Sequence, residues 1–290
     1  MHPAPSLILF TVLSGTGFGL LVWLGLGLSA PVGLAAFLMF GLGYGLAGAG
    51  LIAAAFHLGH PERALKAFTQ WRSSWLSREA VLATATMAVL APHAASSVFA
   101  AAPLPLFGWI GAALSLVTIF ATAMIYTQIK AVPRWHHWST PPVFVLSALA
   151  GGAMLAAQGT LALWLMLALA AAMVAHWIAG DRRFAQSGST TGTATGLAGL
   201  GTVRLLEPPH SGRNYLLREM VHVIGRKHAQ KLRLIALGLG AILPALLLLL
   251  PASYAVIALA LLLHLTGMAA QRWLFFAEAE HVVGLYYGKR

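Results

Sequence analysis

The chain of 290 residues is 59% hydrophobic and only 9% charged, with a mean hydropathy of +0.80. Soluble domains carry about 25% charged residues, so this composition excludes a water-soluble globular protein and indicates a chain that folds in lipid. Eighteen Lys and Arg residues against seven acids give a net charge of +11. These charges stand between apolar stretches, which indicates membrane topology and docking rather than nucleic-acid binding. The absence of cysteine excludes disulfides and iron–sulfur ligation by this chain.

Eight apolar segments approach the length of about 20 residues that a helix needs to cross the hydrocarbon core. The fifth segment is short, and the seventh contains Pro244. In chain order they are Leu7–Leu28, Val32–Phe56, Ala80–Ala101, Leu106–Tyr126, Pro142–Ala157, Leu161–Ala179, Leu234–Leu250 and Ser253–Gln271. We therefore expect an all-α integral membrane protein, an eight-transmembrane-helix bundle that forms a single polytopic domain over residues 1–290.

The loops between these segments alternate in character. Short uncharged loops face one side, and every Lys, Arg, Asp and Glu falls in the loops and tail on the other side. An even number of spans places both termini on this charged side. The positive-inside rule assigns it to the cytoplasm of a bacterial cytoplasmic (inner) membrane.

The first two segments are rich in small residues. Such residues let helix backbones approach closely in lipid, so we expect tight helix packing here; room beside a flat ring ligand is the alternative. The residues concerned are Ser14, Gly15, Gly17 and Gly19 in the first segment and Gly41, Gly43, Gly45, Gly48 and Gly50 in the second.

Residues 181–233 form the largest stretch outside the predicted spans, a basic extramembrane loop. Its second half, Asn214–Arg233, has apolar residues at helical spacing among basic ones, which predicts a basic amphipathic helix. Such a helix either lies on anionic headgroups or docks another subunit. Candidate docking cations in this loop and in the shorter loop before the fifth segment are Lys130, Arg134, Arg218, Arg226, Lys227 and Lys231.

The loop between the second and third segments carries residues suited to proton chemistry. His57 ends the second segment and Glu79 precedes the third, so a short loop makes these two groups neighbours at the membrane edge. A carboxylate and an imidazole there suit proton exchange with a quinol, because two-electron quinone chemistry moves two protons. A purely structural role, with Ser77 as a helix N-cap and the Trp residues in an interfacial belt, stays open. The other candidate quinone-binding residues are Gly59, Arg63, Trp71, Trp75, Ser77 and Arg78.

Three histidines, His93, His176 and His264, lie within the predicted spans. His176 and His264 form the least implausible pair for ligating a haem b between facing helices. We expect polar bonding within the bundle instead, and we expect no metal site.

Three blocks of the sequence together resemble a known family. They are His57-Leu-Gly-His-Pro-Glu-Arg-Ala64 with Leu76-Ser-Arg-Glu79; Ile125-Tyr126 through Val132-Pro133 to Trp138-Ser-Thr-Pro141; and Gly151-Gly152. These blocks, with the order of the spans across nearly the whole chain, resemble the membrane-anchor (C) subunit of dimethyl sulfoxide reductase-type molybdoenzymes, in the polysulfide and nitrite reductase anchor superfamily.

The resemblance implies a quinone-reactive anchor in a three-subunit molybdopterin oxidoreductase. The family's essential quinol-site carboxylate falls on Glu79, and its histidine falls on His57. Electrons would pass between ubiquinone or menaquinone and a four-cluster ferredoxin-like iron–sulfur subunit, and from there to or from a molybdopterin catalytic subunit. The molybdopterin and the iron–sulfur clusters would belong to those partners.

The stretch 180–233 and the tail depart from the enterobacterial dimethyl sulfoxide reductase pattern. Their basic insertion, with Arg272-Trp-Leu-Phe-Phe-Ala-Glu278 and Leu285-Tyr-Tyr-Gly288, resembles the branch with anchors of sulfite-oxidising enzymes (sulfite dehydrogenases). This favours sulfite:quinone oxidoreduction; the alternative is the anchor of a reductase of dimethyl sulfoxide or another S- or N-oxide that oxidises menaquinol. A transporter is disfavoured because no Lys, Arg, Asp or Glu is expected in mid-span.

Overall fold

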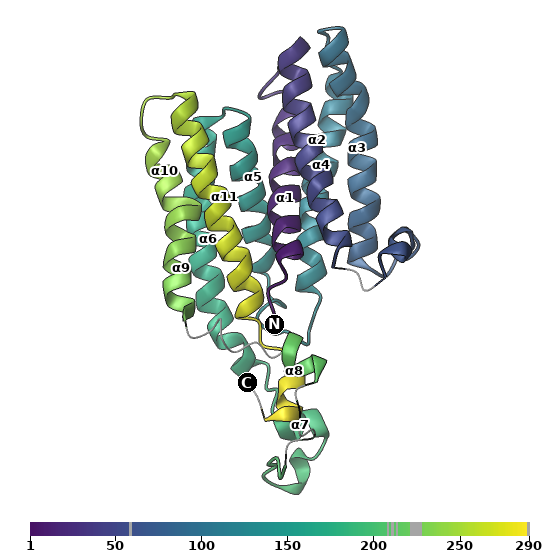
Figure 1. The fold of residues 1–290 in the computed structure, drawn as a ribbon, viewed down its shortest axis with the longest axis vertical. Coiled ribbons are helices and arrows are strands. Elements are labelled where there is room, and N and C mark those ends of the chain that lie inside the picture. The colour runs from purple at the N-terminus through teal and green to yellow at the C-terminus, as the bar shows by residue number, and fades with distance from the viewer. Residues whose placement is uncertain (58–59, 208, 210–211, 213, 221–227, 289–290) are drawn as a thin grey trace.

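The computed structural model describes residues 1–57, 60–207, 209, 212, 214–220 and 228–288, and all regular secondary structure in these residues is helical. The expected all-α class is confirmed. The long helices run roughly parallel to one another (Figure 1). They are α1 (Pro5–Gly25), α2 (Gly33–Ala55), α3 (Trp75–Phe99), α4 (Pro105–Thr127), α5 (Thr140–Leu155), α6 (Gly159–Gln186), α9 (Ala229–Leu237) continued through η4 (Gly238–Ile242) into α10 (Leu243–Leu247), and α11 (Tyr254–Ala277).

Within the described residues, seven helical stretches are long and apolar enough to cross a membrane. They correspond to the predicted segments except the fifth, where α5 has 16 residues and is too short to count as a span by itself. Thr140 begins α5 and is followed by two prolines. Proline suits the first turn of a helix, because a backbone N–H group at that place would have no partner within the helix. The eighth span therefore stays a prediction.

Helix α1 lies at the centre of the bundle and packs against α2, α4, α5 and α11. Its glycines permit this. A Cβ atom on Gly17 would overlap the backbone nitrogen of Ala47 on α2, and one on Gly19 would overlap the carbonyl oxygen of Ala148 on α5. The tight packing predicted from small residues is thus confirmed at these positions. Gly41, Gly45 and Gly48 instead have open space beside them.

The predicted seventh span is irregular around Pro244. Proline cannot donate a backbone hydrogen bond, so the carbonyl four residues earlier, that of Gly240, loses its usual helical partner. A π-helical turn, Gly238–Ile242, precedes the proline at this point. The Nδ1 atom of His264 on α11 donates to the Gly240 carbonyl at 2.6 Å. A neighbouring side chain therefore satisfies a polar group that lipid would leave unpaired.

The N-terminus lies at the same end of the bundle as α7 (Thr191–Thr195) and α8 (Tyr215–Glu219) (Figure 1). The amino group of Met1 donates to the carbonyl of Ala279, just after α11, at 2.8 Å. The predicted loop 181–233 is helical at both ends, because α6 continues to Gln186 and α9 begins at Ala229. Residues 221–227 lie outside the described residues, so the predicted amphipathic helix is not tested as a whole.

Candidate functional site

Glu79 lies in the second turn of α3 and faces the interior of the bundle, with 4% of its surface exposed. The helix begins at Trp75 because Ser74 caps it, accepting a hydrogen bond from the backbone nitrogen of Ser77. Ser77, suggested above as the cap, is instead buried in the first turn, where its hydroxyl donates to the carbonyl of Ala67. These contacts fix the first turn of α3 and hence the direction of the Glu79 side chain.

The partner of Glu79 comes from α4. The hydroxyl of Thr122 donates to Oε1 of the Glu79 carboxyl group, whereas Oε2 has no hydrogen bond among the described residues. Deeper in the same interface, the hydroxyls of Thr86 and Thr118 lie 3.1 Å apart. Thr118, Thr122 and Tyr126 follow one another at a spacing of four residues, which places them on one face of α4. This polar stripe in an apolar span was visible in the sequence and was missed.

Tyr126 belongs to a buried aromatic cluster next to Glu79. Its ring packs edge-on against Trp135 and Phe275, with centroid distances of 5.4 and 5.3 Å. Through Phe275, Tyr126 joins the face of α4 that carries Thr122 to α11.

Arg272 corrects the sequence-based topology. The prediction ended the last span at Gln271 and placed Arg272 in an external tail, but α11 continues to Ala277 and Arg272 is 1% exposed. The hydrophobic residues that follow it, Trp273–Ala277, were the signal that could have revealed this. Its guanidinium lies 3.5 Å from the centre of the Phe144 ring and donates to the hydroxyl of Ser147 at 3.0 Å. Its Nε and Nη1 atoms are buried without a hydrogen-bond partner among the described residues.

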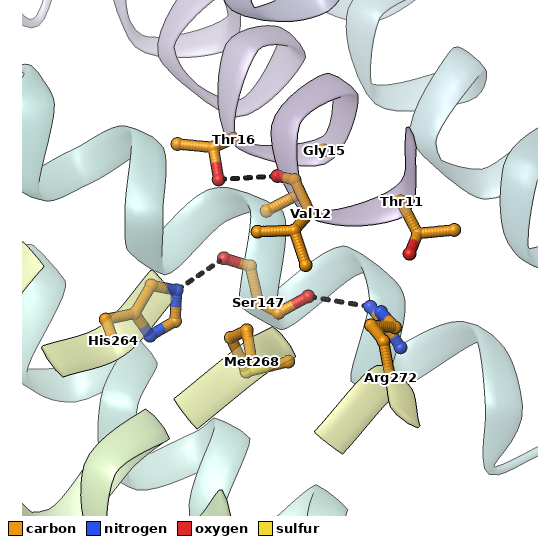
Figure 2. Close-up of a pocket in the computed structure, with 9 residues that line it drawn as sticks. Thr11, Val12, Gly15, Thr16, Ser147, His264, Met268 and Arg272 are labelled. Carbon is orange, nitrogen blue, oxygen red and sulfur yellow. Dashed lines mark hydrogen bonds between the residues drawn. The ribbon is translucent and has the colours of Figure 1, made fainter. Parts of the chain in front are cut away.

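Figure 2 shows the small pocket beside Arg272, where α1, α5 and α11 meet. Its volume of about 10 Å³ is about that of one water-sized probe. Ser147 of α5 lies between the two basic side chains of α11. Its hydroxyl accepts from Arg272, and its carbonyl lies 3.3 Å from Nε2 of His264. A buried cation, an imidazole and two threonines, Thr11 and Thr16, thus line one small pocket together with apolar residues.

The expected neighbours of Glu79 are only partly brought together. His57 is exposed at the end of α2, and none of the described hydrogen bonds or ion pairs joins it to Glu79. Trp75 starts α3 and packs against Phe120 of α4 at a centroid distance of 6.1 Å. Arg63 and Trp71 are exposed on the connecting segment, and Gly59 lies outside the described residues.

Arg78 has a structural role in this arrangement. Its Nε and Nη2 atoms donate to the backbone carbonyls of Trp71 and Arg72, at 3.0 and 2.7 Å, and its guanidinium lies 4.4 Å from the centre of the Trp75 ring. It ties the segment before α3 to the first turn of the helix. Arg78 is only partly buried, whereas Arg272 is buried within the bundle.

Some of the candidate docking residues are exposed, and one is held in ion pairs. Lys130 and Lys231 are exposed. Arg134 is largely buried and joins a four-residue ion-pair network with Asp181, Arg233 and Glu278. The side chain of Arg218 and residues Arg226 and Lys227 lie outside the described part of the chain.

The interior histidines make hydrogen bonds within the bundle, as expected. Nδ1 of His176 pairs with the hydroxyl of Ser139 at 2.9 Å. His264 contacts the carbonyls of Gly240 and Ser147. His93 joins α3 to the residue before α4, with its Nδ1 atom 2.9 Å from the carbonyl of Leu104.

Comparison with known proteins identifies the family of the chain. The profile of the "DMSO reductase anchor subunit (DmsC)" matches residues 1–176, which include Glu79, Thr122 and Tyr126. The chain is also 32% identical to the C subunit of the sulfite dehydrogenase of Allochromatium vinosum, over 99% of both chains. No solved structure matches it. The chain belongs to the family of DMSO reductase anchor subunits, the membrane subunits of oxidoreductase complexes.

Proposed function

We propose that this chain exchanges electrons and protons with membrane quinone on behalf of a three-subunit molybdopterin oxidoreductase, and that Glu79 is the proton-exchanging group. One observation carries the proposal. Glu79 is a carboxyl group held almost fully inside an apolar helix bundle, with one oxygen bonded to Thr122 and the other without a hydrogen bond among the described residues. Placing such a group out of water is costly, and ionisable residues within membrane spans mark functional sites by default.

In this proposal a quinone headgroup binds beside Glu79. A bound quinone supplies two-electron chemistry coupled to two protons, so the protein must provide a proton donor or acceptor beside a ring oxygen. The free Oε2 atom of Glu79 has this capacity. Thr122 holds the carboxyl group in one orientation, and the ring of Trp75, one turn earlier on α3, offers an apolar wall at the same end of the helix.

His57 and Arg272 have distinct parts in this proposal. His57 is exposed at the end of α2, the helix that precedes α3, and relays protons between water and the site. Arg272 carries a buried positive charge on α11, against Phe144 and Ser147 of α5. This charge stabilises negative charge that develops in the interior during reduction or deprotonation.

The membrane arrangement in this proposal has eight spans. Helix α5 is the short eighth crossing, and the end of the bundle that holds both termini is the charged, cytoplasmic face. The iron–sulfur subunit docks on this face, with the exposed Lys130 and Lys231 among its contacts, and the molybdopterin subunit docks on the iron–sulfur subunit. The full-length similarity to a sulfite dehydrogenase anchor favours sulfite as the terminal donor, with electrons flowing to quinone.

A second candidate is the anchor of a reductase that takes electrons from menaquinol. The description of the matching family, a DMSO reductase anchor, favours it. The same residues would then release protons from the quinol. Comparing quinone reduction driven by sulfite with quinol oxidation driven by dimethyl sulfoxide, in membranes that contain the whole complex, separates the two candidates.

The test of the quinone role is Glu79→Gln in the assembled complex. The variant keeps the size of the side chain and an amide oxygen that can accept from Thr122, but it cannot exchange a proton. Because general acid–base groups contribute about 100-fold or more to rate, we expect quinone-linked turnover to fall by about that factor. Turnover with an artificial dye that reacts at the molybdopterin subunit should be unchanged. Glu207→Gln, which removes an exposed carboxylate from the loop after α6, is the matched control.

Quinone-linked turnover of Glu79→Gln equal to that of Glu207→Gln would remove Glu79 from the mechanism. Equal loss of quinone-linked and dye-linked turnover would show that the variant disturbs assembly, and the quinone role would then lack its main support.

A further inference from the structure

A cleft opens at the charged end of α6, away from Glu79 and from the pocket beside Arg272. It has a volume of about 440 Å³. Its upper part, toward the end of α6, holds three basic side chains: Arg182 and Arg183 of α6 and His137 of the segment before α5. Its lower part, toward the middle of α6, is apolar and is formed by Ala175 and Ile178, one to two turns earlier on the helix.

The length of α6 predicts that the cleft spans the boundary between hydrocarbon and headgroups. Helix α6 has 28 residues, a length of about 42 Å, so it is longer than the hydrocarbon core of about 30 Å and its last turns project beyond it. Ile178 is 57% exposed, and from this length we expect lipid tails to reach it. Trp138 is 72% exposed beside His137, with ring centroids 5.3 Å apart, and exposed Trp residues gather at headgroup level.

The positive charge of this cleft is not neutralised by the described part of the protein. The adjacent carboxylate, Asp181, is engaged by Arg134 at 2.7 Å and by Arg233 at 2.6 Å. Among the described residues, no carboxylate lies within ion-pair distance of Arg182 or Arg183.

Arg183 and its effect on His137 show the same excess of positive charge. Arg183 makes two long hydrogen bonds, to the carbonyl of His136 at 3.3 Å and to Gln186 at 3.4 Å, and its Nε atom is buried without a partner among the described residues. Burial and the nearby Arg183 lower the pKa of His137 below its ordinary value. Unused donors and an uncompensated positive field are what an anion requires.

We propose that this cleft binds the phosphate headgroup of an anionic diacyl phospholipid. Arg182 and Arg183 hold the phosphate, and the acyl chains lie along Ala175 and Ile178. The apolar lower part favours a lipid over the docking of a soluble subunit, because a soluble subunit does not reach hydrocarbon depth. Basic pockets at the cytoplasmic ends of membrane helices suit such headgroups. The proposal stands independently of the quinone site.

The test measures lipid binding to the purified full-length chain by native mass spectrometry after delipidation. Phosphatidylglycerol and phosphatidylcholine with identical acyl chains are titrated separately. A basic residue near an anionic lipid contributes about fivefold in affinity, so we expect phosphatidylglycerol to bind about thirtyfold more tightly than phosphatidylcholine. Arg182→Gln should reduce this preference about fivefold, and Arg182→Gln/Arg183→Gln should abolish it.

The control is Lys66→Gln/Arg204→Gln, which also removes two charges, both from exposed segments outside the cleft. It should keep the wild-type preference. Arg182 has no hydrogen bond among the described residues, so the single variant keeps the test valid even if the double variant folds poorly. Equal loss of preference in the control would show a diffuse effect of net charge and overturn the proposal.

Two further outcomes would overturn it. Displacement of phosphatidylglycerol by millimolar inorganic phosphate alone would identify a site for a free anion rather than for a lipid. Wild-type lipid preference in the double variant, together with loss of the iron–sulfur subunit on purification of the complex, would identify the cleft as a protein docking surface.

Discussion

The protein holds charged side chains between its helices in two regions that differ in how the charges are paired. At the charged end of the bundle, Arg134 and Arg233 share the carboxylates of Asp181 and Glu278, and two cations face two anions. Inside the bundle, Glu79 and Arg272 are almost fully buried, yet each has only one side-chain hydrogen-bond partner among the described residues, Thr122 and Ser147 respectively.

The difference indicates different roles. A network whose charges cancel joins the ends of α6, α9 and α11 to the loop before α5, and so stabilises the fold. Unpaired ionisable groups in lipid do not stabilise a fold, so their presence indicates a function. Glu79 lies in the part of the chain that matches the anchor family, whereas Arg272 and most of the network lie beyond residue 176.

The largest expected effect on stability comes from Glu278→Gln. Its side chain is 5% exposed and contacts Arg233 at 2.7 Å and Arg134 at 3.6 Å. Removing one member of a buried ion pair costs about 3–5 kcal/mol, and we expect the lower value because Asp181 still holds both arginines. Thermal unfolding of the purified chain, followed by tryptophan fluorescence, should show a clearly lower midpoint than Glu207→Gln. Equal midpoints would show that the network does not stabilise the fold.

Arg272→Met should separate the two regions most sharply. Methionine fills similar apolar space and removes a buried cation that has two nitrogen atoms without a partner among the described residues. We expect the unfolding midpoint to be equal to or above that of the wild type, while quinone-linked turnover falls about tenfold because about 1.4 kcal/mol of electrostatic stabilisation is lost. Arg233→Met is the contrasting variant and should lower the midpoint. If both variants lower the unfolding midpoint equally, Arg272 stabilises the fold as Arg233 does.

Thr122→Val removes the hydroxyl group that orients Glu79 while keeping the shape of the side chain. A hydrogen bond contributes about 1 kcal/mol, so quinone-linked turnover should fall about fivefold with dye-linked turnover unchanged. Thr122→Ser, which restores the hydroxyl, should recover most of the lost rate. Failure of the serine variant to recover it would show that packing, rather than the hydrogen bond, matters at this position.

The smallest effect is expected for Asp181→Asn. This carboxylate is 47% exposed and lies at the outer side of the network. Exposed ion pairs contribute about 1 kcal/mol or less, so the unfolding midpoint should fall only slightly. The difference from the wild type should shrink further at high salt, which screens exposed charges. A loss as large as that of Glu278→Gln would contradict the distinction between the inner and outer carboxylates.

The helical fold was predictable because crossing lipid imposes a length and a composition that are visible in any apolar stretch. Burial within the bundle was not predictable in the same way. Arg272 was assigned to a tail although the hydrophobic residues Trp273–Ala277 follow it, and the packing of Phe144 and Ser147 around it shows that it is buried. The irregular helix at Pro244 was visible in the sequence, but its compensation by His264 depends on a contact between distant residues.

For the candidate site, the sequence identified Glu79 but not its surroundings. The predicted neighbour, His57, lies near it along the chain, whereas the partner that the structure places against the carboxyl group, Thr122, comes from α4. Two residues on either side of a loop lie at the same end of the bundle, but their side chains need not face the same interface between helices. Which face of each helix points inward is decided by packing between helices, and hydropathy alone does not report it.

The most direct measurement of the central claim is redox-induced infrared difference spectroscopy on the full-length chain reconstituted with quinone in lipid. If Glu79 exchanges the quinone protons, reduction of the quinone changes the carbonyl-stretch band of a protonated carboxyl group. This band should be present in the wild type and in Glu207→Gln and absent in Glu79→Gln. Its persistence in Glu79→Gln would contradict the account, because another group would then carry the protons.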